Sequence, residues 1–404
     1  MVAKIIKTKL EEGAWIRQMF TEGQKLSAKF GADQVFDFSL GNPTLEPPLA
    51  FKNAALKILA SEESGLHRYM DAHGLRDVRA YLAEKLSQEH QLPFTFHHIT
   101  LCVGAGGGLN IVLKALLNPG DEVVILQPFF PEYRNYIANH GGVVREVATT
   151  RDFQIDFAAL EAALCAETCA VLINSPNNPS GAVYSASDLR TLGDLLFKKS
   201  LGRQTPIYLI TDEPYSKILF DEALFAPPIR YYEHTILVTS YSKALAIPGE
   251  RIGYVALSPT CHDCADLVQA LSWSQLALGF VNAPALMQRI IPVIGDQYVD
   301  IAPYQRNRDI LWEHFQKLGV ECVKPQGAFY IFPRTPIADD GVFACEALSE
   351  RLVFVPGRAF GVPNHVRISF CFETEKILRS LKALANVFQC GRERKLQRAD
   401  APSL

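Results

Sequence analysis

The chain has 404 residues, of which 48% are hydrophobic and 21% are charged, and its formal net charge is −3. This length exceeds the size at which one hydrophobic core usually keeps growing, so we expect two domains. The small negative charge gives no electrostatic case for binding nucleic acid or an anionic membrane. No apolar run approaches the ~20 residues that span a bilayer, and residues 1–9 lack the apolar core of a signal peptide, so we expect a cytoplasmic protein.

The N-terminal part of the chain is predicted to contain helices separated by loops. A short helix is expected within residues 1–30, with an apolar face made of Trp15, Ile16, Met19 and Phe20. Residues 37–48 and 65–76 are interrupted by glycine, proline and polar residues, which is typical of loops. The second loop leads into a predicted helix over residues 77–88.

The middle of the chain alternates between short Val-, Ile- and Leu-rich runs and segments of helix length. We predict strands over residues 99–103, 122–126, 143–147, 170–173, 207–211 and 235–239. Nearly continuous apolar strands that alternate with helices indicate a mostly parallel sheet covered on both faces. Ligands of such sheets collect at the carboxyl ends of the strands, so the residues just past those ends are candidates for a site.

Glycines follow the first of these strands, as Gly104-Ala-Gly-Gly-Gly-Leu109, and open a predicted helix over residues 110–117. Glycine lets the backbone approach an anion closely, and a helix N-terminus offers free N–H groups. The run is neither a dinucleotide fingerprint nor a Walker loop. A glycine-rich helix start without any ligand is the alternative.

Aromatic, amide and acidic residues follow the next strands. Pro128-Phe-Phe-Pro-Glu-Tyr133 could stack on a planar ring or simply pack, and Asn174-Ser-Pro-Asn-Asn-Pro-Ser-Gly181 is a turn whose amides can donate to a ligand. Asp212-Glu-Pro-Tyr215 places an acid directly after a buried strand. That acid needs a partner, and a protonated pyridine nitrogen is one.

The last strand leads to a single lysine, Lys243. At the edge of a buried sheet its ammonium can be desolvated, which favours the neutral amine that forms a Schiff base with a carbonyl. Ser240, Ser242 and Arg251 would surround it with the donors that a phosphate needs, which suggests a phosphorylated aldehyde cofactor. Ser240-x-x-Lys243 also matches the penicillin-binding-protein motif, but the Ser-Asp-Asn and Lys-Thr-Gly tripeptides of those enzymes are absent.

Two sequence features give no functional indication. Nine cysteines, scattered from Cys102 to Cys390, are typical of reduced, mostly buried thiols. Cys261-His-Asp-Cys264 is a lone Cys-x-x-Cys, and the histidines lack metal-ligand spacing, so no metal site is expected.

Several motifs together carry a family resemblance over nearly the whole chain. They are Leu40-Gly-Asn-Pro43, Asn177-Asn-Pro-Ser-Gly181, Asp212-Glu-Pro-Tyr215, Ser240-Tyr-Ser-Lys243, Arg251, Gly327-Ala-Phe-Tyr330, Val355-Pro-Gly357 with Phe360-Gly361, and Arg367-Ile-Ser-Phe370. In this order and spacing the chain resembles the fold-type I pyridoxal-phosphate aminotransferases of classes I and II. Ser180 stands where the family often has threonine, and Ala105 where many members have serine.

The resemblance implies catalytic roles. Lys243 would hold pyridoxal 5′-phosphate as a Schiff base and then shuttle the substrate proton. Asp212 would keep the pyridine nitrogen protonated, which makes the ring an electron sink. Tyr215 and Asn178 would contact the ring oxygen. Arg367 would bind the substrate carboxylate as a bidentate pair, helped by Asn178 and the backbone at Gly41.

It also implies how the rest of the cofactor is held. Phe130 would stack on its ring. The phosphate would contact the backbone N–H groups of Ala105 and Gly106, together with Ser240, Ser242 and Arg251. Tyr69 would reach the same phosphate from a second subunit, so a homodimer with shared active sites is expected.

The implied architecture is a large and a small domain. Residues 49–295 would form a large cofactor domain with a mostly parallel seven-stranded sheet whose odd antiparallel strand is 253–257. The N-terminal arm, residues 1–48, would join residues 296–404 in a smaller α+β domain. Independently, residues 292–303 read as a junction. After it we predict helices at 304–318 and 374–388 and strands at 329–332 and 365–370.

The sequence therefore predicts an enzyme that moves an amino group between an L-amino acid and a 2-oxo acid by two half-reactions. A pyridoxal-phosphate carbon–sulfur β-lyase on the same fold is the alternative, because it needs the same Lys243, Asp212 and carboxylate-binding arginine. A cofactor-sensing regulator is disfavoured, since no basic helical module precedes the enzyme-like part. Residues 274–280 contain no arginine for a second substrate carboxylate, which favours a neutral or apolar substrate side chain, packed against residues such as Trp15, Ile16 or Tyr133.

Overall fold

The computed structural model describes the chain except residues 1, 5, 8–9, 11–13, 63 and 400–404, and its centre is a seven-stranded sheet. In spatial order the strands are β2 (Ile99–Cys102), β8 (Gly253–Leu257), β7 (Thr235–Ser240), β6 (Tyr208–Asp212), β5 (Thr168–Asn174), β3 (Glu122–Leu126) and β4 (Val143–Val147). β8 is antiparallel to both of its neighbours, whereas the pairs from β7 to β4 are parallel. This arrangement confirms the predicted fold class and the antiparallel strand at 253–257.

Alternate residues of each strand pack on opposite faces of the sheet, because the side-chain period of a strand is two. Val123 and Ile125 of β3 belong to a cluster with Leu109 and Leu113, whereas Val124 lies in a cluster with Leu192 on the other face. Both faces of the sheet are therefore buried, as the continuous apolar runs predicted.

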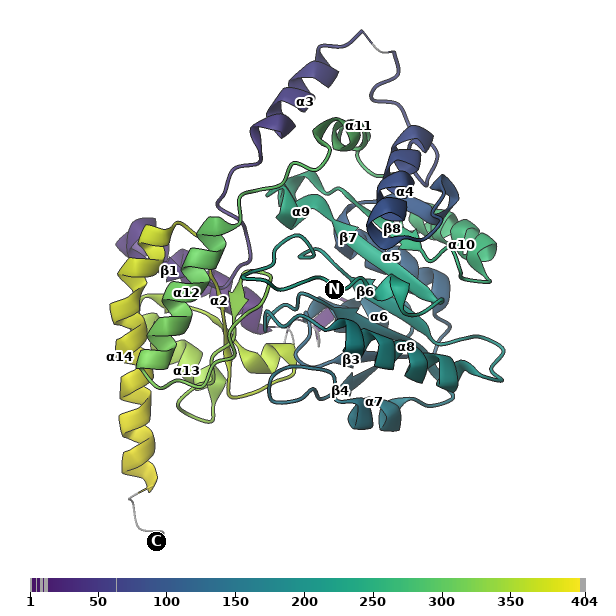
Figure 1. The fold of residues 1–404 in the computed structure, drawn as a ribbon. Coiled ribbons are helices and arrows are strands. Elements are labelled where there is room, and N and C mark those ends of the chain that lie inside the picture. Colours follow the sequence, from purple (N-terminus) through teal and green to yellow (C-terminus); the bar gives the residue numbers. More distant parts are fainter. Residues whose placement is uncertain (1, 5, 8–9, 11–13, 63, 400–404) are drawn as a thin grey trace.

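Helices cover the sheet on both sides (Figure 1). Those before, between and after its strands are α3 (Leu49–Leu59), α4 (Arg76–His90), α5 (Gly104–Leu116), α6 (Glu132–Asn139), α7 (Phe157–Ala163), α8 (Ala186–Ser200), α9 (Tyr241–Ala244), α10 (Cys264–Ala277) and α11 (Ala285–Ile294). Among the helices that the structure describes, none has the length and apolar character needed to cross a membrane.

A smaller α+β part gathers on one side of the sheet (Figure 1). Its elements are α2 (Ala14–Phe30), β1 (Phe36–Asp37), α12 (Ala302–Lys317), β9 (Tyr330–Ile331), α13 (Asp340–Ala347), β10 (Leu352–Val353), β11 (Val355–Pro356), β12 (Val366–Ser369) and α14 (Thr374–Ala399). β1 pairs in parallel with β10, so the N-terminal segment is joined to the C-terminal one. Phe38, Phe315 and Phe329 lie in their shared core.

Three predicted boundaries were wrong. α5 begins at Gly104 and not near residue 110, because packing overrides the low helix propensity of four glycines. α11 runs through Pro292 to Ile294, so the predicted junction begins inside a helix; Pro292 cannot donate a helical hydrogen bond, but burial of Ile290, Ile291 and Ile294 in the core stabilises the helix across it. α14 continues to Ala399, beyond the predicted end at residue 388, although its last turns are polar and highly charged.

Candidate active site

A cavity of about 370 Å³ opens at the carboxyl ends of β5, β6 and β7, between the sheet and the smaller part of the fold. The structure brings twelve of the predicted site residues to its wall: Gly41, Ala105, Gly106, Phe130, Asn178, Asp212, Tyr215, Ser240, Ser242, Lys243, Arg251 and Arg367. Tyr69 is absent from this wall and its side chain is 87% exposed. Parallel strands and short following turns explain the convergence, since their carboxyl ends share one edge of the sheet.

Lys243 lies on α9, the short helix that follows β7. Its Nζ donates a hydrogen bond to the carbonyl oxygen of Gly41, at 2.7 Å. Burial lowers the pKa of Lys243 to about 8, and the nearby guanidinium groups of Arg367 and Arg251 act in the same direction. A larger share of neutral amine is therefore present near neutral pH than in a solvated lysine.

Asp212 is the last residue of β6, and its two carboxylate oxygens differ in their surroundings. Oδ2 accepts a hydrogen bond from the Tyr133 hydroxyl, at 2.5 Å, whereas Oδ1 is buried without a hydrogen-bond partner among the described residues. Burial raises the pKa of Asp212 to about 7, and the bond from Tyr133 opposes that rise. Asn174 fixes the backbone by donating to the Asp212 carbonyl, at 2.8 Å.

Arg367 projects from β12 in the smaller part of the fold and is only 4% exposed. Its Nη1 donates to Asn178 Oδ1 at 3.1 Å, and its Nη2 donates to the carbonyl of Ser39. The guanidinium carbon lies 4.8 Å from the ring centre of Tyr330 and 4.9 Å from that of Phe360. Burial lowers the pKa of Arg367, but a guanidinium stays charged, so the site keeps a fixed planar cation.

The start of α5 and Arg251 form a side of the cavity that presents N–H groups and a cation. The backbone N–H groups of Ala105 and Gly106 lie in the first turn of α5, so the residues four positions earlier are outside the helix and their carbonyls cannot accept a helical hydrogen bond. Gly104 has a φ of 75°, and a Cβ there would lie 2.6 Å from Nη2 of Arg251. Arg251 itself is in the left-handed region, with a φ of 53°. Its guanidinium donates to the carbonyls of Pro248 and Val103, at 3.0 and 3.3 Å, so it is held against the helix start.

These residues fit pyridoxal 5′-phosphate. The buried Oδ1 of Asp212 is a costly orphan acceptor, and a pyridinium N–H would satisfy it. A phosphate would meet the free amides of α5, two buried serines and Arg251. The aldehyde would then lie on the side of the cavity where Lys243 projects.

Sequence reasoning missed several residues that contact this set. The Tyr330 hydroxyl lies 2.9 Å from that of Tyr215, and a Cβ on Gly41 would overlap it, so only glycine fits there. Asn174 and Tyr133 hold Asp212. Both tyrosines lay within stretches that the sequence marked as informative, but nothing in the local pattern indicated which group each would meet.

Two of the residues expected near the substrate side chain have contacts within the chain. The guanidinium carbon of Arg358 lies 5.6 Å from the ring centre of Trp15, and the Tyr133 hydroxyl donates a hydrogen bond to Asp212. The side chain of Ile16 lies outside the described part of the structure. In the segment 274–280, the buried Gln275 donates to the carbonyls of Ala72 and Leu101, so it serves the fold.

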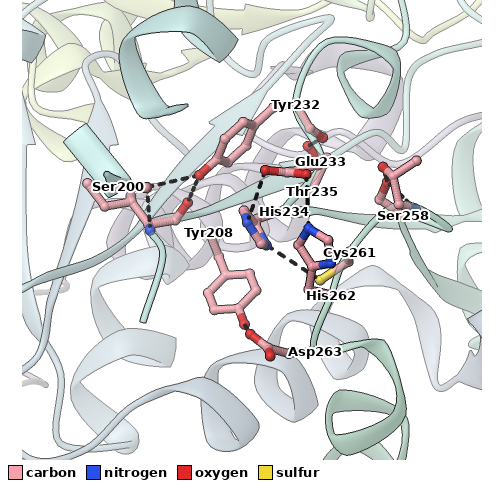
Figure 2. Close-up of polar contacts among 12 residues, drawn as sticks. Ser200, Tyr208, Tyr232, Glu233, His234, Thr235, Ser258, Cys261, His262 and Asp263 are labelled. Atoms are coloured by element: carbon pink, nitrogen blue, oxygen red, sulfur yellow. Dashed lines mark hydrogen bonds and ion pairs between the residues drawn. The ribbon is translucent and has the colours of Figure 1, made fainter. Parts of the chain in front are cut away.

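The Cys261–Cys264 segment follows β8, whose last residue Leu257 pairs with Ile236 near the start of β7, so it lies at the opposite end of these strands from the cavity. Figure 2 shows its polar contacts. Cys261 Sγ is 3.7 Å from His234 Nδ1, and Glu233 contacts the rings of His234 and His262. Among the residues that the structure describes, no cluster of three or more His, Cys, Asp or Glu side chains could hold a metal. The structure describes all nine cysteines, and none of them forms a disulfide bond.

Comparison with known proteins places the chain in a family. The family model for aminotransferases of class I and II matches residues 33–384. The chain is similar to the aspartate/prephenate aminotransferase of Thermus thermophilus, with 34% identity over 86% of this chain and 89% of that relative.

Solved structures agree. An amino transferase from Eubacterium rectale is similar at a TM-score of 0.91 and 38% identity, covering 96% of this chain and 99% of that one. The aspartate aminotransferase of Thermotoga maritima is similar at a TM-score of 0.84 and 26% identity, covering 96% and 100%. A family match over most of the chain, together with a cavity that fits pyridoxal phosphate, shows that this protein belongs to the class I and II pyridoxal-phosphate-dependent aminotransferases.

Proposed function

We propose that this aminotransferase works by two half-reactions in the cavity described above, with Lys243 as the cofactor-bearing residue. One observation carries the proposal: a lysine of lowered pKa, a buried acid with one unpaired oxygen and a buried planar cation line the same cavity. These three groups supply an amine for the aldehyde, a counter-ion for a pyridinium and a partner for a carboxylate.

Each chain residue then has a distinct task. Lys243 would attach the cofactor and would move the proton at the substrate Cα. Arg367 orients the α-carboxylate through its planar fork, with Asn178 fixing the guanidinium. Tyr215 would contact the ring oxygen of the cofactor, and its hydroxyl contact with Tyr330 limits the directions in which it can donate. When bound, pyridoxal phosphate supplies the electron sink that makes the Cα proton removable.

The substrate side chain is a separate proposal. Among the described residues of one chain, three cationic side chains line the cavity: Lys243, Arg251 and Arg367. They are already assigned to cofactor attachment, the phosphate and the α-carboxylate. A second carboxylate would need a further cation, and the segment 274–280 offers none. This supports a neutral or apolar side chain, whereas the similar Thermus thermophilus protein is an aspartate/prephenate aminotransferase. A panel of amino acids decides between these substrate classes.

We also propose a homodimer in which Tyr69 reaches the partner's phosphate site. Its 87% exposure and its absence from its own cavity support this arrangement. The large and small domains are proposed at 49–295 and 296–404, with residues 1–48 joining the second. Nine cysteines without a disulfide bond support a reducing compartment such as the cytoplasm.

The test is a set of single half-reactions. Purified protein loaded with pyridoxal phosphate is mixed with one amino acid at a time, without any oxo acid, and its absorbance spectrum is followed. Transamination converts the cofactor to pyridoxamine phosphate and releases one oxo acid per site. A cofactor that stays in the aldehyde form while pyruvate and ammonia accumulate would instead establish the carbon–sulfur β-lyase activity.

A further inference from the structure

The partner of Asp212 is the feature from which we draw a further inference. Tyr133, on α6, is 1% exposed, and its hydroxyl donates to Oδ2 of Asp212 at 2.5 Å. Residues 133 and 212 are far apart in the chain, and both side chains are buried. With Oδ2 occupied, Oδ1 is the oxygen left without a partner in the described part of the chain.

This hydrogen bond sets the orientation of the carboxylate. A carboxyl group held at one oxygen by a buried, directional donor has lost most of its freedom about χ2. Oδ1 is therefore aimed before any ligand arrives, and the ordering cost of pairing it is already met by the fold. Asn174 adds to this by fixing the Asp212 carbonyl at 2.8 Å.

The same bond also acts on the charge of Asp212. Burial disfavours the carboxylate anion and raises the pKa of Asp212, whereas a donated hydrogen bond favours the anion. Burial, together with the adjacent carboxylate, raises the pKa of Tyr133 well above its usual value. The phenol therefore stays protonated and remains a donor near neutral pH.

Tyr133 further contacts the aromatic residue expected to face the cofactor ring. The Phe130 and Tyr133 rings meet edge to face, with centres 5.6 Å apart and planes at 79°. One side chain thus contacts both the acid and the aromatic ring that lines the cavity.

We propose that Tyr133 is a positioning residue: it holds Asp212 as an oriented anion whose Oδ1 pairs with the protonated pyridine nitrogen of the cofactor. This inference rests on the proposed function, because it requires Asp212 to meet that nitrogen. It assigns to Tyr133 a task different from contact with the substrate side chain, which the sequence had suggested.

The test replaces the donor and reads the pyridine nitrogen directly. Tyr133→Phe keeps the ring against Phe130 and removes only the hydroxyl. Wild type and variant are loaded with pyridoxal phosphate labelled with ¹⁵N at the ring, and the nitrogen chemical shift is followed against pH. The variant should lose the ring proton at a lower pH than wild type, and it should bind the cofactor about ten-fold more weakly, as expected for loss of a hydrogen bond to a charged group.

The chain offers a matched control. Tyr208, at the other end of the same strand β6, donates to Asp263 Oδ2 at 3.2 Å (Figure 2), and neither residue lines the cavity. Tyr208→Phe also removes a tyrosine–aspartate hydrogen bond, but it should leave the nitrogen titration and the cofactor affinity unchanged. Thermal unfolding of both apoproteins shows whether either loss is merely structural.

The possible outcomes distinguish the role of Tyr133 from the proposed pairing of Asp212 with the pyridine nitrogen. The role of Tyr133 alone would be overturned if the ring nitrogen of Tyr133→Phe lost its proton at the same pH as in wild type and the cofactor dissociation constant stayed within two-fold. A wild-type ring nitrogen that is unprotonated at neutral pH would overturn the proposed role of Asp212 itself. If Tyr133→Phe does not fold, Tyr133→His, which keeps an aromatic N–H donor, should preserve the wild-type titration, and failure of that rescue would also count against the inference.

Discussion

Replacing Arg367 by lysine separates substrate recognition from cofactor binding. Arg367 presents a buried planar fork that is already held by Asn178 and the Ser39 carbonyl. Lysine keeps the charge but offers a single point donor, so one of two charge-assisted bonds to the substrate carboxylate is lost. Such a bond contributes about 1.5–3 kcal/mol. At ~1.4 kcal/mol per ten-fold, kcat/KM for amino acids should fall by about 10- to 100-fold.

The assay is steady-state kinetics of the Arg367→Lys variant, with cofactor affinity measured separately by absorbance titration. The dissociation constant of pyridoxal phosphate should stay within about two-fold, because Arg367 does not lie at the anion-binding start of α5. Arg251→Lys is the matched variant, and it should do the reverse by weakening the cofactor first. An Arg367→Lys enzyme with unchanged kcat/KM, or with cofactor affinity reduced by the same factor, would place the carboxylate site elsewhere.

Three further outcomes are expected. The amine of Lys243 must be neutral to attack an aldehyde, and burial lowers its pKa to about 8. The rate at which the apoprotein takes up pyridoxal phosphate should therefore rise through about pH 8 and level off above it. A rise centred near the ordinary lysine pKa would contradict the argument from burial. Gly41→Ala should nearly abolish activity, because the new Cβ overlaps the Tyr330 hydroxyl. Gly249→Ala, with open space around its Cβ, is the control. An active Gly41→Ala enzyme would contradict this prediction by showing that the backbone at residue 41 can move away from Tyr330. If Tyr69 acts across a dimer, mixing the Tyr69→Ala and Lys243→Ala variants should restore activity at one site of each hybrid, and a mixture no more active than its components would place Tyr69 in its own site.

Much of the fold was predictable because its signals are local. The strands over 122–126, 143–147 and 253–257 match the observed bounds, since β-branched apolar runs are bounded there by turn residues. Helix ends were less certain. The start of α5 at Gly104 depends on packing against the sheet and on Arg251, which no local propensity records.

The candidate site was predicted largely through motifs, and the gaps have one cause. Lys243, Asp212 and Arg367 follow strands or lie within one, so sequence pattern and resemblance place them at the cavity. The contacts of Tyr133 with Asp212 and of Tyr330 with Tyr215 join residues 79 and 115 positions apart. Such pairs arise only when the whole sheet and the smaller part of the fold come together.

The central claim, that Lys243 carries the cofactor, has a direct chemical test. The protein is loaded with pyridoxal phosphate, the lysine–cofactor bond is reduced with borohydride to a stable secondary amine, and the modified peptide is identified by mass spectrometry. The label should lie on Lys243, the lysine whose Nζ meets the Gly41 carbonyl in the cavity. A label on another lysine, or no label at all, would contradict the mechanism proposed for this enzyme.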